Sequence, residues 1–179
     1  MDKLTLNNQV TIPLTGLGVY QINNLDECEH TVLNALKMGY RLINTAACYG
    51  NEKAVGNAIK KSQIPREDIF ISSKVWIQDA DYQKTKQSFA KTLENLQTNY
   101  LDLYLIHMPF GDYHGSWQAM EELYASGKIK AIGVCNFLPD RLVDLILSHN
   151  IIPAVNQIEL HLLCQQQELL KLMKKYDIK

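Results

Sequence analysis

The apolar residues of this chain recur with two spacings that alternate along the sequence. Short apolar runs of the kind that form strands are each followed by a segment with apolar residues every three or four positions, as on one face of a helix. The predicted strands cover residues 17–22, 41–44, 68–75, 101–107, 129–137 and 154–160, and the predicted helices cover residues 26–38, 51–61, 82–96, 117–126, 139–149 and 165–176. This alternation predicts parallel strands joined by crossover helices, either in a doubly wound sheet or in a TIM-type barrel.

A separate pattern precedes the first of these units. Residues 4–12 form two runs of alternating apolar and polar residues around Asn7-Asn8, which predicts a β-hairpin ended by Pro13. Within the units, Asp26 is the predicted N-cap of the first helix, and Gly127 is the predicted residue just past the end of helix 117–126. These two predicted capping residues support the same helix boundaries as the apolar pattern.

Two features favour the barrel over the doubly wound sheet. A doubly wound nucleotide-binding fold carries Gly-x-Gly-x-x-Gly after its first strand, and the sequence contains no such run. Residues whose side chains could take part in catalysis or binding instead lie at or just after the ends of successive predicted strands: Asn44, Tyr49, Lys74, Trp76, His107, Asn136 and Gln157. Because a barrel gathers its strand ends at one face, we predict an α/β fold of the TIM type, incomplete, with about six of eight βα units after an N-terminal hairpin.

Composition narrows the class of protein. Hydrophobic residues make up 46% and charged residues 21% of the chain, as in an ordinary globular protein, so we expect one domain over residues 1–179. The formal net charge is −1, from 18 basic and 19 acidic residues, which provides no general attraction to nucleic acid or to an anionic membrane. The N-terminus is too short and polar for a signal peptide, and no apolar run approaches a membrane span, so we expect a cytoplasmic protein.

The four cysteines, Cys28, Cys48, Cys135 and Cys164, are far apart in the sequence. They show no Cys-x-x-Cys spacing and no histidine at zinc-binding intervals. We therefore expect reduced thiols, mostly buried as small hydrophobic residues, and no metal site.

Residues 39–52 read Gly-Tyr-Arg-Leu-Ile-Asn-Thr-Ala-Ala-Cys-Tyr-Gly-Asn-Glu. This stretch resembles the first signature of the aldo-keto reductase family, roughly Gly-Phe/Tyr-Arg-x-x-Asp-Thr-Ala followed by Tyr-Gly-Asn-Glu. Residues 73–76, 102–109, 133–137 and 155–161 are similar to further motifs of that family, in the family's order. The resemblance covers essentially the whole chain and implies a barrel that reduces aldehydes and ketones to alcohols with NADPH.

The resemblance implies a catalytic role for four residues. Tyr49 would be the general acid that protonates a carbonyl oxygen while the nicotinamide delivers hydride to the carbon. A phenol has a reference pKa of about 10, so the Lys74 ammonium group would ease its loss of a proton. His107 would orient the carbonyl group, and Asn44 stands where the family has an aspartate that pairs with the lysine and binds the nicotinamide ribose.

The resemblance also implies the surfaces that bind cofactor and substrate. Residues expected to bind NADPH are Gly18, Val19, Tyr20, Asn44, Cys135, Asn136 and Gln157, with the amides of the last two on the nicotinamide carboxamide. Residues expected to line the substrate side are Tyr20, Trp76, His107 and Phe110. Met108 replaces a tryptophan common after this histidine in the family, which affects the lining of the pocket more than the chemistry.

Asn44 is the first departure from the family pattern. The substitution removes a negative charge but keeps a side chain that forms hydrogen bonds. Without a carboxylate partner, a buried Lys74 should have a lowered pKa and should support the Tyr49 phenolate less well. We therefore expect activity to be reduced.

The length of the pattern is the second departure. A full barrel has eight units and about 250 residues, so the resemblance implies a C-terminally truncated member that lacks the family's third signature, its cofactor-phosphate contacts and the aromatic residue stacked on nicotinamide. Six strands would leave open edges near Gly18 and Gln157. We expect the barrel to be completed by a second copy, by swapped elements or by another polypeptide.

The sequence is compatible with three functional interpretations. The first is a reductase of small aldehydes and ketones, supported by Tyr49, Lys74 and His107 in family order, although each residue alone would more often be structural. The second is an impaired or inactive homologue that acts through self-association or partner binding, favoured by Asn44 and the open edges. The third, an ion-channel accessory subunit, rests only on the fold that such subunits share.

Overall fold

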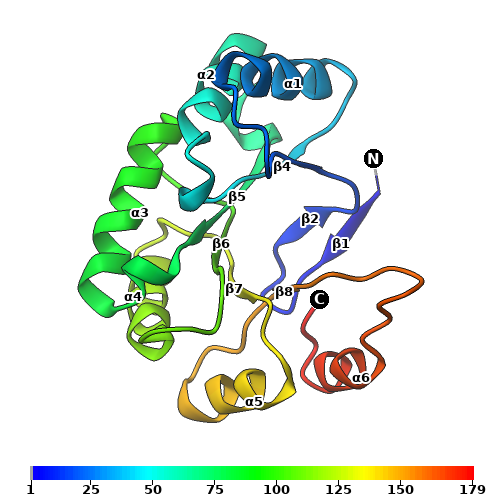
Figure 1. Cartoon of the computed structure of the whole chain (residues 1–179), viewed down its shortest axis with the longest axis vertical. Helices are drawn as coiled ribbons and strands as arrows, with labels where there is room; N and C mark the ends of the chain where they lie inside the picture. Colours follow the sequence, from blue (N-terminus) through cyan, green and yellow to red (C-terminus); the bar gives the residue numbers. More distant parts are fainter. Residues whose placement is uncertain (1) are drawn as a thin grey trace.

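The computed structural model describes residues 2–179 and contains a parallel sheet in which each strand pairs with the next along the chain, in the order β3-β4-β5-β6-β7-β8. The strands are β3 (Leu17–Gly18), β4 (Leu42–Asn44), β5 (Phe70–Val75), β6 (Leu103–Ile106), β7 (Ile132–Cys135) and β8 (Asn156–Gln157). The helices form an arc around the outside of this curved sheet (Figure 1). The prediction of an incomplete TIM-type barrel with six units is therefore confirmed.

The helices follow the predicted apolar faces, with boundaries set by their caps. They are α1 (Leu25–Lys37), α2 (Glu52–Ser62), α3 (Tyr82–Leu96), α4 (Tyr113–Ala125), α5 (Pro139–Ser148) and α6 (Gln167–Lys175). The predicted N-cap Asp26 is wrong, because the side chain of Asn24 accepts the first free N–H groups of α1. Helix α4 begins four residues before the predicted Trp117, because Asp112 caps it through the N–H of Gly115. Gly127 follows α4 with a φ of +74°, as predicted.

The two outermost strands are shorter than predicted. Strand β3 ends at Gly18 and β8 ends at Gln157, whereas the apolar pattern continues to Ile22 and Leu160. Within residues 2–179, each of these strands pairs with a neighbour on one side only, so its ladder stops where that neighbour ends. The open edges therefore lie at Gly18 and Gln157, as the sequence predicts.

The predicted hairpin is present and covers one end of the sheet. Strands β1 (Lys3–Thr5) and β2 (Thr11–Pro13) pair antiparallel. Leu6, between them, is buried in an apolar cluster with residues of the inner face of the sheet. The side-chain amides of Asn7 and Asn8 donate to the backbone carbonyls of Pro153 and Lys130, at 3.1 and 2.9 Å. The hairpin thus closes the amino ends of the strands and leaves their carboxyl ends free.

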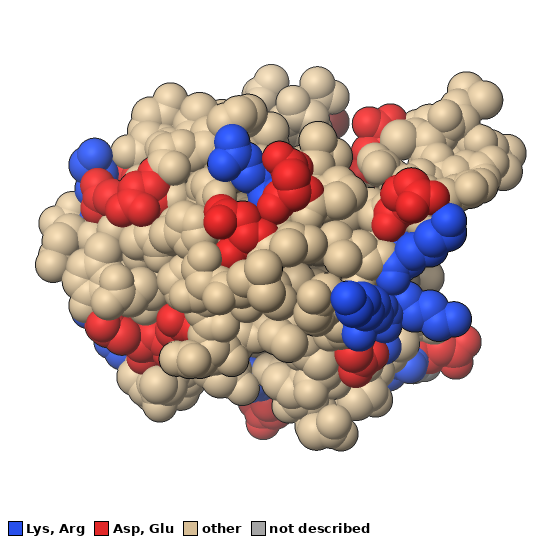
Figure 2. Space-filling model, turned by 90° about the horizontal axis from the view of Figure 1, so that it is seen from below, with Lys and Arg blue, Asp and Glu red and all other residues tan. Residues whose placement is uncertain are grey.

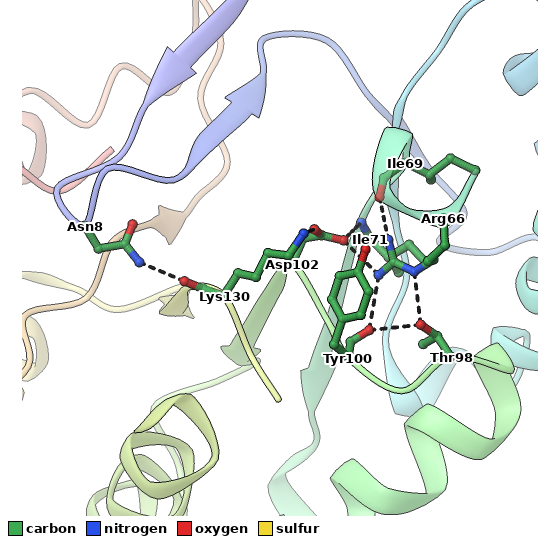
Figure 3. Close-up of polar contacts among 8 residues, drawn as sticks. All are labelled: Asn8, Arg66, Ile69, Ile71, Thr98, Tyr100, Asp102 and Lys130. Carbon is green, nitrogen blue, oxygen red and sulfur yellow. Dashed lines mark hydrogen bonds and ion pairs between the residues drawn. The ribbon is translucent and has the colours of Figure 1, made fainter. Parts of the chain in front are cut away.

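A buried ion cluster connects consecutive units at the same end (Figure 3). The Asp102 carboxylate, just before β6, accepts the backbone N–H of Ile71 at 3.0 Å and pairs with Arg66 at 2.8 Å and Lys130 at 2.9 Å. The two cations lie 4.1 and 4.3 Å from the centre of the Tyr100 ring. Because Arg66 precedes β5 and Lys130 precedes β7, one carboxylate joins three units.

The charged surface is mixed in sign. On the face seen in Figure 2, acidic and basic side chains are interspersed and neither sign covers the whole face. Across residues 2–179, the length and hydropathy that a membrane-crossing helix needs are not reached by any helix.

Replacing Asp102 by alanine should lower the free energy of unfolding by about 3 kcal/mol, because Arg66 and the Ile71 N–H would lose a buried acceptor. The matched control is Lys130→Ala. The Lys130 side chain is 43% exposed, so its loss should cost about 0.5 kcal/mol. Urea unfolding followed by circular dichroism measures both, and equal losses would contradict a central role for the carboxylate.

Candidate active site

The carboxyl ends of the strands bring together the polar residues that the sequence singles out. Asn44 and Gln157 are the last residues of β4 and β8, and Lys74 is the penultimate residue of β5. His107 and Asn136 directly follow β6 and β7. Five consecutive strands therefore contribute side chains to one end of the sheet, opposite the hairpin turn, which is where barrels place their sites.

Lys74 is the most buried of these residues, with 1% of its surface exposed. Its Nζ donates to Asn44 Oδ1 and to the Thr45 carbonyl, both at 3.0 Å, and lies 3.5 Å from the Tyr49 hydroxyl. No carboxylate in the described part of the chain forms an ion pair with it. Burial without a counter-charge lowers the pKa of Lys74 to about 8, in the direction predicted from Asn44.

Asn44 connects three strands through one atom. Its Oδ1 accepts from Lys74, from Ser72 Oγ at 2.7 Å and from Gln157 Nε2 at 3.5 Å. An uncharged amide oxygen therefore occupies the centre of a donor cluster. Asn44 therefore positions the Lys74 ammonium group by a hydrogen bond but supplies no negative charge to compensate it.

Tyr49 reaches the cluster from η1 (Ala47–Tyr49), a short 3-10 helix that follows β4 and ends at Gly50 with a φ of +68°. Its ring lies 5.2 Å from Lys74 Nζ. Burial raises the pKa of Tyr49 to about 12, so the expected lowering by Lys74 is not seen. The main cause is desolvation of the phenolate by burial, and the Lys74 Nζ lies 3.5 Å from the hydroxyl, at the limit of hydrogen-bond distance.

His107 lies beside Tyr49, with their ring centres 5.6 Å apart and edge to face. Its Nδ1 is 3.5 Å from the Sγ of Cys48, and only 9% of the residue is exposed. Burial, aided by the charge of Lys74, lowers the pKa of His107 to about 4. The imidazole is therefore neutral at neutral pH and can donate one N–H.

Aromatic rings line one side of this cluster. The Tyr20 ring lies 5.0 Å from that of Tyr49, and the Trp76 ring lies 4.9 Å from that of His107. Phe110 is 57% exposed, and within residues 2–179 it packs against no other aromatic ring. The structure thus joins two of the predicted substrate-side aromatics to Tyr49 and His107 and leaves Phe110 apart.

The other predicted cofactor-side residues lie around the cluster that Asn44 centres. Asn136 has a left-handed φ of +61°, and its Nδ2 donates to the His107 carbonyl at 3.1 Å. The Cys135 thiol lies 3.8 Å from Gln157 Oε1. Gly18 pairs with Asn44 in the sheet, and the loop after it carries Val19 and Tyr20. The set therefore forms a continuous border from β3 to β8.

Asn51 is a supporting residue that the sequence reasoning missed. It is 1% exposed, accepts from Thr45 Oγ1 at 2.9 Å and donates to the Val19 carbonyl at 2.9 Å. These bonds fix the segment that carries Tyr49 against the loop after β3. The asparagine within Tyr-Gly-Asn-Glu was visible in the sequence, but its partners depend on the fold of that segment.

The cysteines are free thiols, as predicted, but only half of them are buried. Cys28 and Cys135 are buried, Cys164 is partly exposed and Cys48 is exposed. The expectation of mostly buried thiols is therefore wrong for the last two. Cys48 is exposed because η1 turns it toward the open end of the sheet, next to His107.

Together these groups have the chemistry needed to donate a proton. At neutral pH the Tyr49 phenol and the His107 imidazole each carry a proton that they can donate, and Lys74 supplies a positive charge. Such a set suits an oxygen atom that gains negative charge during a reaction.

Comparison with known proteins identifies relatives along nearly the whole chain. The family model described as "Aldo/keto reductase family" matches residues 15–179. A glyoxal reductase of Bacillus subtilis is 49% identical over 169 residues, which are 94% of this chain and 61% of that protein. This chain thus spans about 60% of the length of such curated relatives.

Solved structures agree with this relationship. An aldo/keto reductase of Brucella melitensis superposes with a TM-score of 0.96 and is 44% identical, covering 99% of this chain and 70% of that one. An aldo-keto reductase of Bombyx mori in complex with NADP has a TM-score of 0.94 and 30% identity, covering 99% of this chain and 64% of that one.

The lowered pKa of His107 predicts a pH dependence of stability. Between pH 6.5 and pH 4, His107 binds a proton in the unfolded chain but not in the folded chain. The contribution of the neutral imidazole to stability, which is present above pH 6.5, is therefore lost as pH falls toward 4. Urea unfolding should show the difference between the native chain and His107→Gln growing by about 2 kcal/mol over this range. Curves that stay parallel from pH 4 to pH 6.5 would contradict the assignment.

Proposed function

We propose that this chain, which belongs to the aldo/keto reductase family, forms a site that reduces aldehydes and ketones to alcohols with NADPH. The observation that carries the proposal is the convergence of Tyr49, Lys74 and His107 at one end of the sheet, with the phenol 3.5 Å from the amine. The name of the Bacillus subtilis relative supports a small aldehyde as substrate, and the NADP complex of the Bombyx mori relative supports the cofactor.

In this proposal Tyr49 and His107 act on the carbonyl oxygen, and Lys74 acts on Tyr49. When bound, NADPH supplies a hydride to the carbonyl carbon, and the electron pair of the C=O bond moves to oxygen. Tyr49 then gives its phenolic proton to that oxygen, and Lys74 stabilises the phenolate left behind. His107 holds the oxygen with its single N–H before transfer, and solvent returns the proton to Tyr49 afterwards.

The side chains present fit the nicotinamide end of the cofactor. Within residues 2–179, Asn136 Oδ1 accepts no hydrogen bond, and Gln157 Oε1 has only the distant Cys135 thiol. Two amide oxygens are therefore available for the carboxamide of nicotinamide. Asn44 Nδ2, which also lacks a partner in the described residues, suits a ribose hydroxyl.

The test measures NADPH consumption with glyoxal by absorbance. The native chain should oxidise NADPH in proportion to alcohol formed, and Tyr49→Phe should lower kcat by about 100-fold or more, because the general acid is lost. Binding of NADPH, followed by its fluorescence, should be unchanged in this variant. A Tyr49→Phe variant as active as the native chain would overturn the assignment of Tyr49.

Restoring a carboxylate should improve the site. In Asn44→Asp, a negative charge 3.0 Å from Lys74 Nζ should raise the pKa of Lys74 above its present value of about 8. We expect turnover to rise about tenfold and its alkaline limb to move to higher pH. Asn44→Ala, which removes the acceptor altogether, is the control and should lower turnover; equal or lower turnover in Asn44→Asp would count against this account.

A second candidate function is self-association of a weakly active or inactive homologue. Strands β3 and β8 each have an unpaired edge, and unpaired edges favour pairing with another chain. Beyond β8, His161 and Cys164 exchange two backbone hydrogen bonds and close a tight turn. The turn presents Leu162 and Leu163 with 90% and 94% of their surface exposed.

Self-association predicts a concentration-dependent dimer in sedimentation velocity. Leu162→Glu combined with Leu163→Glu should shift the chain to monomer, because charges would replace exposed leucines at the contact. The matched control is Leu147→Glu on α5, a leucine that is 76% exposed and lies outside the turn of residues 161–164. A native chain that sediments as a monomer at micromolar concentration would rule this candidate out.

A further inference from the structure

Cys48 and His107 form a contact that the proposed mechanism does not use. Cys48 directly precedes Tyr49 in η1, and its Sγ lies 3.5 Å from Nδ1 of His107. The other ring nitrogen, Nε2, has no hydrogen-bond partner within residues 2–179. The two nitrogens of the imidazole are therefore in different situations, one bonded to a side chain and one available to a ligand.

Chemistry decides the direction of this hydrogen bond. Although Cys48 as a residue is exposed, partial desolvation of its thiol raises the pKa of that group, so the sulfur keeps its proton at neutral pH. The His107 imidazole is neutral and carries one proton on one of its nitrogens. An imidazole nitrogen lone pair is a good acceptor, whereas a thiol sulfur is a weak one, so the chemistry favours donation from S–H to Nδ1.

We propose that the Cys48 thiol donates to His107 Nδ1 and thereby keeps the imidazole proton on Nε2, which makes Cys48 a positioning residue for the carbonyl group. The inference rests on the proposed reduction for its consequence in catalysis, but the position of the proton can be measured without it. It assigns a role to a side chain that lies next to the general acid in sequence.

The proton on Nε2 matters because a neutral imidazole offers one donor and one lone pair. With Nε2 protonated, His107 presents an N–H to an oxygen held beside Tyr49. In the other tautomer the same nitrogen would present a lone pair, which repels a carbonyl oxygen. Because Cys48 and Tyr49 are neighbours in η1, this short helix places both the acid and the group that orients its partner.

A nucleophilic or oxidant-sensing role for Cys48 is less consistent with the site. Such a role requires the thiolate, which a raised pKa disfavours. The positive charge of Lys74 acts in the opposite direction but is the smaller effect. The thiol therefore acts here as a proton donor to nitrogen.

The decisive measurement is the 15N spectrum of the histidine rings at pH 7, with His107→Gln to assign the signals. In the native chain we expect the Nδ1 signal of His107 in the range of an unprotonated nitrogen and the Nε2 signal in the range of a protonated one. Cys48→Ala should move both signals toward the average of the two tautomers, and Cys48→Ser, which restores a hydroxyl donor, should move them back. The control Cys164→Ala removes a thiol outside the cluster and should leave them unchanged.

Two results would overturn the proposal: a native His107 protonated on Nδ1, or His107 signals that do not change in Cys48→Ala. Cys48→Ala should lower kcat about fivefold, which is the effect expected for the loss of one neutral hydrogen bond. The KM for NADPH should not change. Undiminished kcat in Cys48→Ala would also contradict the positioning role. If the native chain consumes no NADPH, the proposed function fails, while the spectrum still decides the position of the proton.

Discussion

The buried ammonium group of Lys74 is the constraint on which the site depends. A charge with 1% exposure must be compensated by its surroundings, and here uncharged oxygens from Asn44, Thr45 and Tyr49 provide the compensation. Those contacts fix the end of β4 and the start of η1 relative to β5. The position of the phenol is therefore a consequence of how the lysine is accommodated.

The two ends of the sheet treat charge in opposite ways. At the amino end, Asp102 is paired with two cations and also takes a backbone N–H, so the cluster is closed and supports stability. At the carboxyl end, Lys74 forms no ion pair within residues 2–179; burial lowers its pKa, and burial together with the charge of Lys74 lowers the pKa of His107. The amino end of the sheet therefore supports the fold. The carboxyl end carries the residues with shifted pKa values, and a barrel can change these residues without changing its fold.

Periodicity is sufficient to predict the fold, and the strand ends predict which polar residues the structure brings together at one end of the sheet. The sequence pattern misplaced Asp26 as a cap and extended β3 and β8, since caps and edge pairing depend on neighbours that periodicity does not reveal. The contact of Cys48 with His107 and the bonds of Asn51 were not predictable for the same reason. They join residues 59 and 32 positions apart through the geometry of a single 3-10 turn.

The charges left in the site determine which protonation states are available for the proposed reaction. Reduction needs a protonated phenol, whereas oxidation of an alcohol needs a phenolate to accept the proton. With the pKa of Tyr49 at about 12 and no carboxylate beside Lys74, the phenol stays protonated at neutral pH. Lys74, which forms no ion pair within residues 2–179, supplies a positive charge that stabilises an oxygen gaining negative charge. Asn44 therefore lowers the pKa of the lysine while the phenol stays protonated, so the proton donor of the proposed reaction is retained although its support by Lys74 is weaker.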